Sequence, residues 1–149
     1  MAGVSGTKAQ TPDIFIIAGE SSGDELGASL MDAIRTRQPD ARFRGVGGPA
    51  MSARGLTSLF PMSDIAVMGF VPVVRNLRRL LARISLAADV VIAQPPDALV
   101  IIDSPDFTHR VARRLRAKRA DVPVVNYVSP TVWAWRPGRA KKMKPYVDH

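Results

Sequence analysis

Apolar runs of strand length, each closed by a polar turn, constrain the fold of this chain more than any other feature. They are "DIFIIAGE" at 13–20, "RFRGVGG" at 42–48, "ALVIID" at 98–103 and "VPVVNYV" at 122–128, with "LTSLF" at 56–60 as a further short candidate. Segments with helical spacing separate most of them. Strands that are apolar on both faces are typical of a parallel sheet covered by helices on both sides. The sequence therefore predicts an α/β domain of this kind.

The helices are expected in the intervening segments. Apolar residues three and four positions apart predict a helix after the first strand that ends before Pro39, and further helices at 73–93 and 106–120. A short helix is expected at 50–54. With 149 residues, of which 46% are hydrophobic, the chain can bury one core. We expect one domain over 13–149, preceded by a disordered tail at 1–12.

Composition excludes several classes of site. The chain has no cysteine and only two histidines, so we expect no disulfides, no metal site and no metal cofactor. The N-terminal residues lack the pattern of a secretory signal. The longest uncharged apolar stretch, at 65–74, is far shorter than the roughly 20 residues of a membrane-spanning helix.

The net charge of +8 is concentrated in the second half of the chain. Residues 75–144 hold 15 Lys and Arg against 5 Asp and Glu, whereas residues 1–74 hold 6 against 7. This bias favours an anionic partner such as nucleic acid, a phosphate-bearing ligand or an acidic membrane surface. A basic surface that serves only solubility is the alternative.

The motif "GESSGD" stands between the first strand and its helix. Backbone N–H groups at a helix N-terminus can hold an anion or a sugar hydroxyl. The motif matches neither the dinucleotide-binding nor the P-loop fingerprint. The alternative is a tight turn in which the acid near the helix start is favoured by capping and the helix dipole. The candidate ligand-binding residues here are Gly19, Glu20, Ser21, Ser22, Gly23 and Asp24.

The stretch "LVIIDSPDF" ends a buried strand in two acids. Asp103 is expected to enter the crevice at the carboxyl end of the sheet, where ligands bind in such folds. Pro105 disfavours helical geometry at Ser104, so the helix is expected to begin at Asp106, which would cap it. Asp103 then either faces a substrate or accepts hydrogen bonds from neighbouring loops.

The segment 73–84 forms an amphipathic helix with an apolar stripe on one side and four arginines on the other. Such a helix commonly packs its stripe on a sheet and solvates its charges. Basic amphipathic helices also bind anionic lipid surfaces, and the apolar segment before this one favours that second interpretation. The candidate membrane-contact residues are Met68, Phe70, Val71, Val74, Arg75, Leu77, Arg78 and Arg79.

Both tryptophans lie in "VSPTVWAWRPGRAKKMKPY" at 128–146, together with several cations. Aromatic and cationic side chains in alternation can line a sugar and phosphate site, although tryptophans also serve as packing anchors. Ser129, Trp133 and Arg136 are the candidate binding residues of this segment.

Taken together, these motifs resemble one family. "GESSGD", "RFRGVGGPAM", "DIAVMGFVPVVRNLRRLL", "IIDSPDF" and "NYVSPTVWAWRPGR" occur in the order and at the spacing of the lipid-A-disaccharide synthases, over nearly all of 13–149. The departures are small, a serine in place of a common alanine in "GESSGD" and Thr131 in place of a common serine. The resemblance implies a Rossmann-like domain that is the N-terminal, acceptor-side half of a GT-B glycosyltransferase.

The resemblance also implies a reaction. The family transfers 2,3-diacylglucosamine from UDP to the 6-hydroxyl of 2,3-diacylglucosamine 1-phosphate, which gives a β-1,6 disaccharide 1-phosphate and UDP. Inversion at the sugar requires a base for the attacking hydroxyl, and Asp103 is the candidate. Further implications are a location on the cytoplasmic face of the inner membrane of a Gram-negative bacterium, a homodimer of the full-length enzyme, and no nucleic-acid partner or cofactor. The UDP-binding residues are expected beyond His149, so this chain alone is expected to be inactive.

A different class of protein remains open from charge alone. A stand-alone basic module could use the same crevice for a nucleotide or a nucleic acid, with an affinity that falls steeply with salt. The five motifs favour the enzyme.

Overall fold

A computed structural model describes residues 11–66, 70–128 and 138–149. Its four strands form one parallel sheet in the order β2-β1-β3-β4, which confirms the predicted fold class. The strands are β1 (Asp13–Ile17), β2 (Arg42–Val46), β3 (Ala98–Ile101) and β4 (Val124–Asn126). The helices are α1 (Ser21–Arg37), α2 (Pro49–Ser52), α3 (Phe70–Ala93), α4 (Pro105–Lys118) and α5 (Arg139–Met143), with a 3₁₀ turn, η1, at Met62–Asp64.

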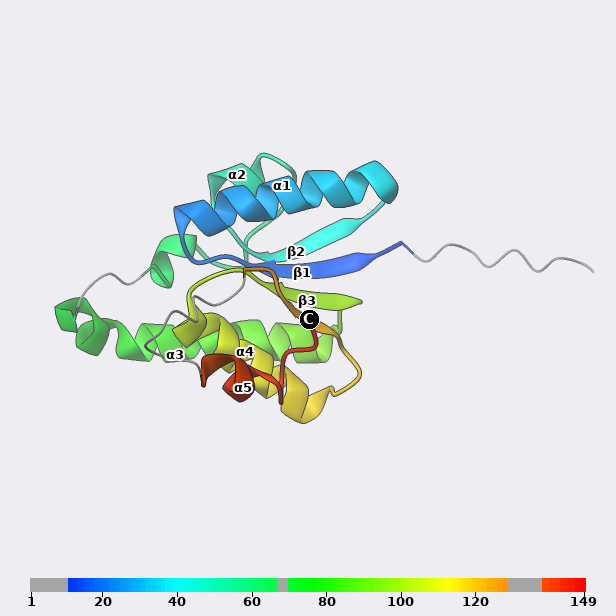
Figure 1. Ribbon diagram of the computed structural model, residues 1–149. Helices are drawn as coiled ribbons and strands as arrows, with labels where there is room; N and C mark the ends of the chain where they lie inside the picture. The colour runs from blue at the N-terminus through cyan, green and yellow to red at the C-terminus, as the bar shows by residue number, and fades with distance from the viewer. Residues whose placement is uncertain (1–10, 67–69, 129–137) are drawn as a thin grey trace, which may run out of the picture.

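The sheet lies between two helical layers (Figure 1). Helices α1 and α2 cover one face, and α3, α4 and α5 cover the other. Alternate residues of β1 pack against the two helical layers, because successive side chains of a strand point to opposite faces. Phe15 and Ile17 are buried with residues of α3 and α4, whereas Ile16 is buried with residues of α1 and α2.

The prediction of a short strand at 56–60 is wrong. This segment forms only an isolated bridge between Ser58 and Gly45. The Ser58 hydroxyl donates to the carbonyl of Phe60 at 2.6 Å and accepts from the N–H of Gly47 at 3.2 Å, so local hydrogen bonds replace a sheet ladder. Leu56 and Phe60 are buried in the two cores, and packing explains their apolar character without sheet pairing.

The expected start of α4 is wrong by one residue. The helix begins at Pro105, whose fixed φ and missing N–H suit the first helical position. Ser104 precedes it in a left-handed conformation, with φ at 49° and ψ at 61°. Asp106 lies inside the first turn, and no side chain caps the helix, so the predicted capping role of Asp106 is also wrong.

Candidate functional site

The site forms where β1 and β3 end side by side, because parallel neighbours bring their carboxyl ends to one edge of the sheet. Asp103 follows β3, and both of its carboxylate oxygens accept backbone hydrogen bonds from the loop after β1. The N–H of Gly19 donates to Oδ1 at 2.5 Å, and the N–H of Glu20 donates to Oδ2 at 3.1 Å. The "GESSGD" loop and the "DSPDF" segment therefore meet at this edge of the sheet.

Two glycines allow this close approach. A Cβ at Gly23 would lie 1.9 Å from Oδ2 of Asp103, and a Cβ at Gly19 would lie 2.1 Å from Oγ of Ser104. Real Cβ atoms are not found at such distances, so a larger residue at either position would displace the loop or the acid. The glycines of the motif therefore hold the Asp103 carboxylate at the start of α1.

Burial raises the pKa of Asp103 above its ordinary value of 3.8. The backbone N–H groups of Gly19 and Glu20 oppose this effect because they stabilise the carboxylate, while the nearby charge of Glu20 adds to it. The result is an oriented carboxylate with a stronger affinity for a proton than an exposed aspartate has. These are properties that a general base requires.

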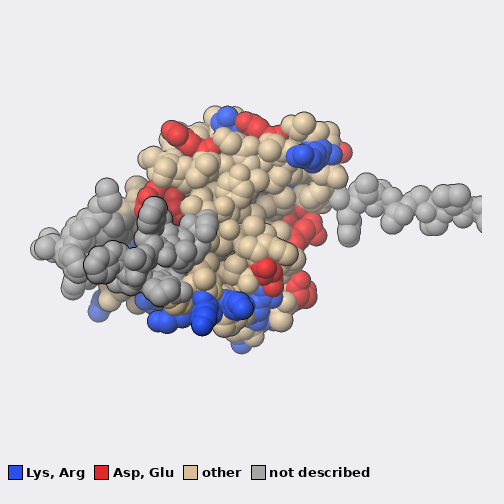
Figure 2. All heavy atoms as spheres, in the orientation of Figure 1, with Lys and Arg blue, Asp and Glu red and all other residues tan. Residues whose placement is uncertain are grey.

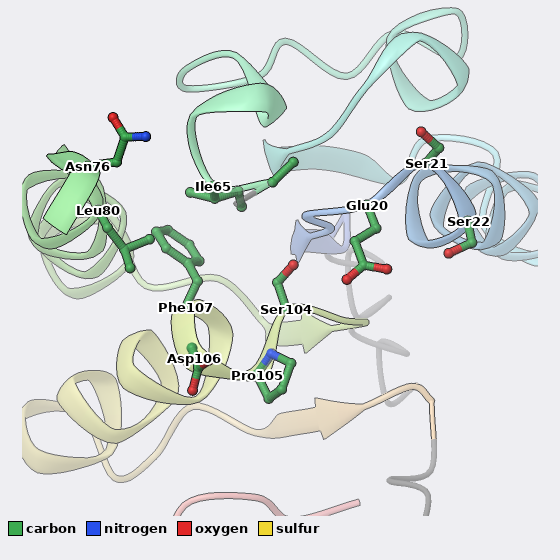
Figure 3. A pocket seen from close by; sticks show the side chains of 11 residues that line it. Glu20, Ser21, Ser22, Ile65, Asn76, Leu80, Ser104, Pro105, Asp106 and Phe107 are labelled. Atoms are coloured by element: carbon green, nitrogen blue, oxygen red, sulfur yellow. The ribbon is translucent and has the colours of Figure 1, made fainter. Parts of the chain in front are cut away.

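A first cavity opens beside the start of α4 (Figure 3). It has a volume of about 500 Å³, and Ile65, Leu80 and Phe107 give it an apolar wall. The carboxylate of Glu20 and the hydroxyl of Ser104 point toward the space between the starts of α1 and α4. Ser21 and Ser22 also line this cavity, so three of the six predicted residues of "GESSGD" lie at its wall.

A second cavity of about 440 Å³ adjoins the first. The two share Glu20, Ser104, Pro105 and Asp106, and Asp103 lines the second. The remaining lining residues come from the end of β3, from α4, from the segment around β4 and from the C-terminal segment that contains α5. These are Ile102, His109, Arg110, Arg113, Asn126, Val128, Lys142, Met143 and Tyr146.

The structure separates Asp24 from the other residues of its motif. Its side chain is 3% exposed and accepts hydrogen bonds from the N–H groups of Gly48, Ala50 and Met51, at 2.8 to 3.1 Å. Asp24 thus caps the N-terminus of α2 and lines neither cavity. Its geometry agrees with the structural alternative considered for it, although the helix that it caps is α2 and not α1.

Helix α3 divides its apolar stripe between the core and the surface. Ile84 is buried and Leu80 packs against the core, whereas Leu77 and Leu81 are 46% and 40% exposed. Arg78 and Arg79 are exposed. Within the described residues, no helix is long and apolar enough to cross a membrane.

Several predicted residues lie outside the described part of the chain. These are Met68, Ser129, Trp133 and Arg136, together with the side chains of Phe70, Val71, Val74 and Arg75. Among the residues that the structure does describe, no three His, Asp or Glu side chains are grouped so that they could hold a metal ion.

Helix α4 contributes a face to the second cavity that the sequence did not predict. Asp106, His109, Arg110 and Arg113 line it and recur at the spacing of one helix face. The spacing is readable in the sequence, but the approach of this face to β4 and α5 is a tertiary contact that the sequence does not indicate. The Nδ1 of His109 lies 2.9 Å from the hydroxyl of the buried Tyr146.

Comparison with known proteins places this geometry in context. Residues 14–149 match the sequence profile of the family described as lipid-A-disaccharide synthetase. The lipid-A-disaccharide synthase of Nitrobacter hamburgensis is 63% identical over 137 residues, which make up 91% of this chain and 35% of that protein. Two enzymes of the same name from Rhodopseudomonas palustris are similar. The strain HaA2 enzyme is 55% identical over 100% of this chain and 38% of its own length, and the strain BisB18 enzyme is 61% identical over 91% and 35%.

Proposed function

Because the chain belongs to the lipid-A-disaccharide synthetase family, we propose that it forms the acceptor-side part of a lipid A glycosyltransferase. The proposed reaction moves 2,3-diacylglucosamine from UDP to the 6-hydroxyl of 2,3-diacylglucosamine 1-phosphate. It forms a β-1,6 disaccharide 1-phosphate and releases UDP. The aligned segments are 35–38% of the relatives' length, so we assign the UDP-binding residues to sequence outside this chain. Below, "the full-length enzyme" means a protein of the relatives' length that contains this chain.

One observation carries the proposed mechanism. The carboxylate of Asp103 is fixed by two backbone N–H groups at the edge of the sheet, and it lines a cavity. Each oxygen retains a lone pair that can accept the proton of an acceptor hydroxyl. We assign to Asp103 the role of general base, which increases the nucleophilicity of the hydroxyl as it attacks the sugar carbon.

The walls of the two cavities suit an acylated sugar. The apolar side chains of Ile65, Leu80 and Phe107 can contact an acyl chain, while Glu20 and Ser104 can bind sugar hydroxyls. The exposed Leu77 and Leu81 of α3, beside Arg78 and Arg79, support contact with an anionic inner-membrane surface from which such a substrate is drawn.

The test is transfer by the full-length enzyme in detergent micelles that contain both substrates. We expect UDP and a β-linked disaccharide 1-phosphate in equal amounts, measured by mass spectrometry and by NMR of the anomeric proton. This chain alone is the control and should form neither. Hydrolysis of the donor without transfer, or retention of the α configuration, would contradict the proposal.

A further inference from the structure

The second cavity has three cationic side chains on its wall. Arg110 and Arg113 lie on the face of α4 that lines the cavity, and Lys142 approaches from α5. Figure 2 shows that basic side chains gather along the lower edge of the molecule, on the side of the sheet that carries α3, α4 and α5. Arg110, Arg113 and Lys142 line a recess on this side of the sheet.

No acid neutralises these cations by an ion pair in the part of the chain that the structure describes. The arginines that form ion pairs there are Arg44, Arg54, Arg79, Arg83, Arg116 and Arg119. Arg110, Arg113 and Lys142 form none of the ion pairs in this part of the chain, and all three are exposed to solvent. Their charges are available to a ligand in the cavity.

The Arg113 guanidinium is oriented by its neighbours. It stacks over the Tyr146 ring, with 4.8 Å from Cζ to the ring centroid, and its Nη2 lies 3.4 Å from the Tyr146 hydroxyl. Tyr146 is 5% exposed and also contacts His109. A stacked guanidinium loses less conformational entropy when it binds an oxyanion than a free one does. This wall is therefore partly organised before a ligand arrives.

The acids lie at one end of the cavity wall, and the cations of α4 extend away from them. Glu20, Asp103 and Asp106 belong to the loops and the first turn of α4, whereas Arg110 lies one helical turn beyond Asp106 and Arg113 about 10 Å beyond it along the axis of α4. A ligand that fits this polarity presents a hydroxyl to the acids and an anion to the cations. A sugar that carries a phosphate monoester has both groups.

We propose that Arg110, Arg113 and Lys142 form a phosphate-monoester site, and that it holds the 1-phosphate of the acceptor while Asp103 receives the proton of its hydroxyl. Arginine suits this role because its planar fork matches phosphate oxygens, and lysine adds a mobile charge. The assignment of the phosphate to the acceptor rests on the proposed function. The anion site itself rests on the cavity and its charges.

Binding to this chain tests the anion site independently of transfer. Calorimetric titration at low salt would use N-acetylglucosamine 1-phosphate, with inorganic phosphate and N-acetylglucosamine as separate probes. We expect saturable binding of the sugar phosphate, weaker binding of inorganic phosphate and none of the neutral sugar. The double variant Arg110→Gln/Lys142→Gln should lower affinity on the order of 10-fold or more.

The matched control is Lys118→Gln/Lys141→Gln, which removes the same charge from exposed positions of the same two segments outside the cavity lining. It should stay within about twofold of the parent affinity. Circular dichroism establishes that each variant is folded, and Arg110→Gln alone replaces the double variant if that variant does not fold. Equal losses in both double variants, or no saturable binding by the parent chain, would overturn the anion site.

Transfer by the full-length enzyme tests which substrate carries the phosphate. Arg110→Gln/Lys142→Gln should raise the KM for the acceptor on the order of 10-fold and leave the KM for the donor unchanged. A raised donor KM with a normal acceptor KM would overturn the assignment to the acceptor. Absence of transfer by the parent enzyme would refute the proposed function, while the binding titration would still decide the anion site.

Discussion

The Asp103 carboxylate combines a fixed orientation with a raised pKa. It is held by Gly19 and Glu20, and burial raises its pKa. Since a general base acts only when it is deprotonated, activity should be lost as the pH falls through this raised pKa, which lies above 3.8. The folded state binds the Asp103 proton more tightly than the unfolded chain does. Protonation of Asp103 therefore stabilises the folded state, whereas catalysis requires the deprotonated form. That stabilisation is fully present below pH 3.8 and is lost as the pH rises through the raised pKa.

The measurement is the pH dependence of kcat/KM for the full-length enzyme, with denaturant unfolding followed at the same pH values. We expect an acid limb that follows a single ionisation above pH 3.8 while the protein remains folded. Constant kcat/KM down to that pH, or a limb that coincides with unfolding, would show that Asp103 does not set the profile.

Asp24 illustrates a residue whose role the sequence could not give. Its carboxylate serves three N–H groups from Gly48 to Met51, and it is buried. Asp24→Ala should lower the free energy of unfolding by about 2–3 kcal/mol, because hydrogen bonds to a charged group are lost and buried donors are left unpaired. Urea denaturation of this chain measures the change.

The control for Asp24 is Asp32→Ala. Asp32 pairs with Arg54, but its side chain is 54% exposed, so its loss should cost at most about 1 kcal/mol. Equal destabilisation by the two variants would contradict the capping role of Asp24.

Sequence alone located the acid at the strand end but not its hydrogen-bond partners. An apolar run that ends in Asp103 places the acid at the sheet edge, since strand ends are readable from the pattern. Gly19 is 84 residues away in the chain, and its contact with Asp103 depends on β1 and β3 being neighbours. Likewise, nothing near Asp24 in the sequence indicates α2 as its partner. Both contacts are tertiary, and one sequence carries no direct signal for them.

At the scale of elements, the exposed surface of α3 is the candidate membrane contact. Leu77, Arg78 and Arg79 are the described part of the predicted membrane contact, and the neighbouring Leu81 is exposed as well. The variant Leu77→Ser/Arg78→Glu should reduce flotation of this chain with anionic vesicles, because apolar insertion and attraction to head groups are both weakened.

The α3 variant Leu77→Ser/Arg78→Glu has a matched control in Leu26→Ser/Arg37→Glu on α1, which also removes one exposed leucine and reverses one charge, but on the other face of the sheet. The α1 variant should float as the parent chain does, on vesicles of phosphatidylethanolamine and phosphatidylglycerol. Equal flotation of the α3 variant and the parent would leave α3 with a structural role only.

Elements with strong periodicity were predicted well, and the failures have local causes. The pattern located α1, α3, β1 and β3 because each buries a regular apolar face. The segment 56–60 has buried apolar residues at both ends, yet the Ser58 hydroxyl bonds to a nearby carbonyl and the segment forms only one bridge, with Gly45. Apolar character reports burial, and sheet pairing also requires free backbone donors and acceptors.

At the scale of the whole molecule, the chain matches 35–38% of the relatives' length and contains one sheet with both layers of helices. The crevice at the end of that sheet carries the base candidate, the apolar wall and the cations. In the proposed enzyme, residues outside this chain bind the donor and present it to this edge of the sheet. We therefore expect substitutions at this edge to impair activation of the acceptor hydroxyl and to leave donor binding intact.

Turnover of Asp103→Asn in the full-length enzyme, at saturating concentrations of both substrates, decides whether this edge is the reaction centre. Asn keeps the size of the side chain and one of its two acceptor oxygens but lacks the proton affinity of a carboxylate, so kcat should fall by on the order of 10²–10⁴ in a folded enzyme that still binds its substrates. Asp40→Asn is the control, since Asp40 is exposed and lines neither cavity, and its kcat should stay within about twofold of the parent value. Near-normal kcat in a folded Asp103→Asn enzyme would contradict the role assigned to Asp103.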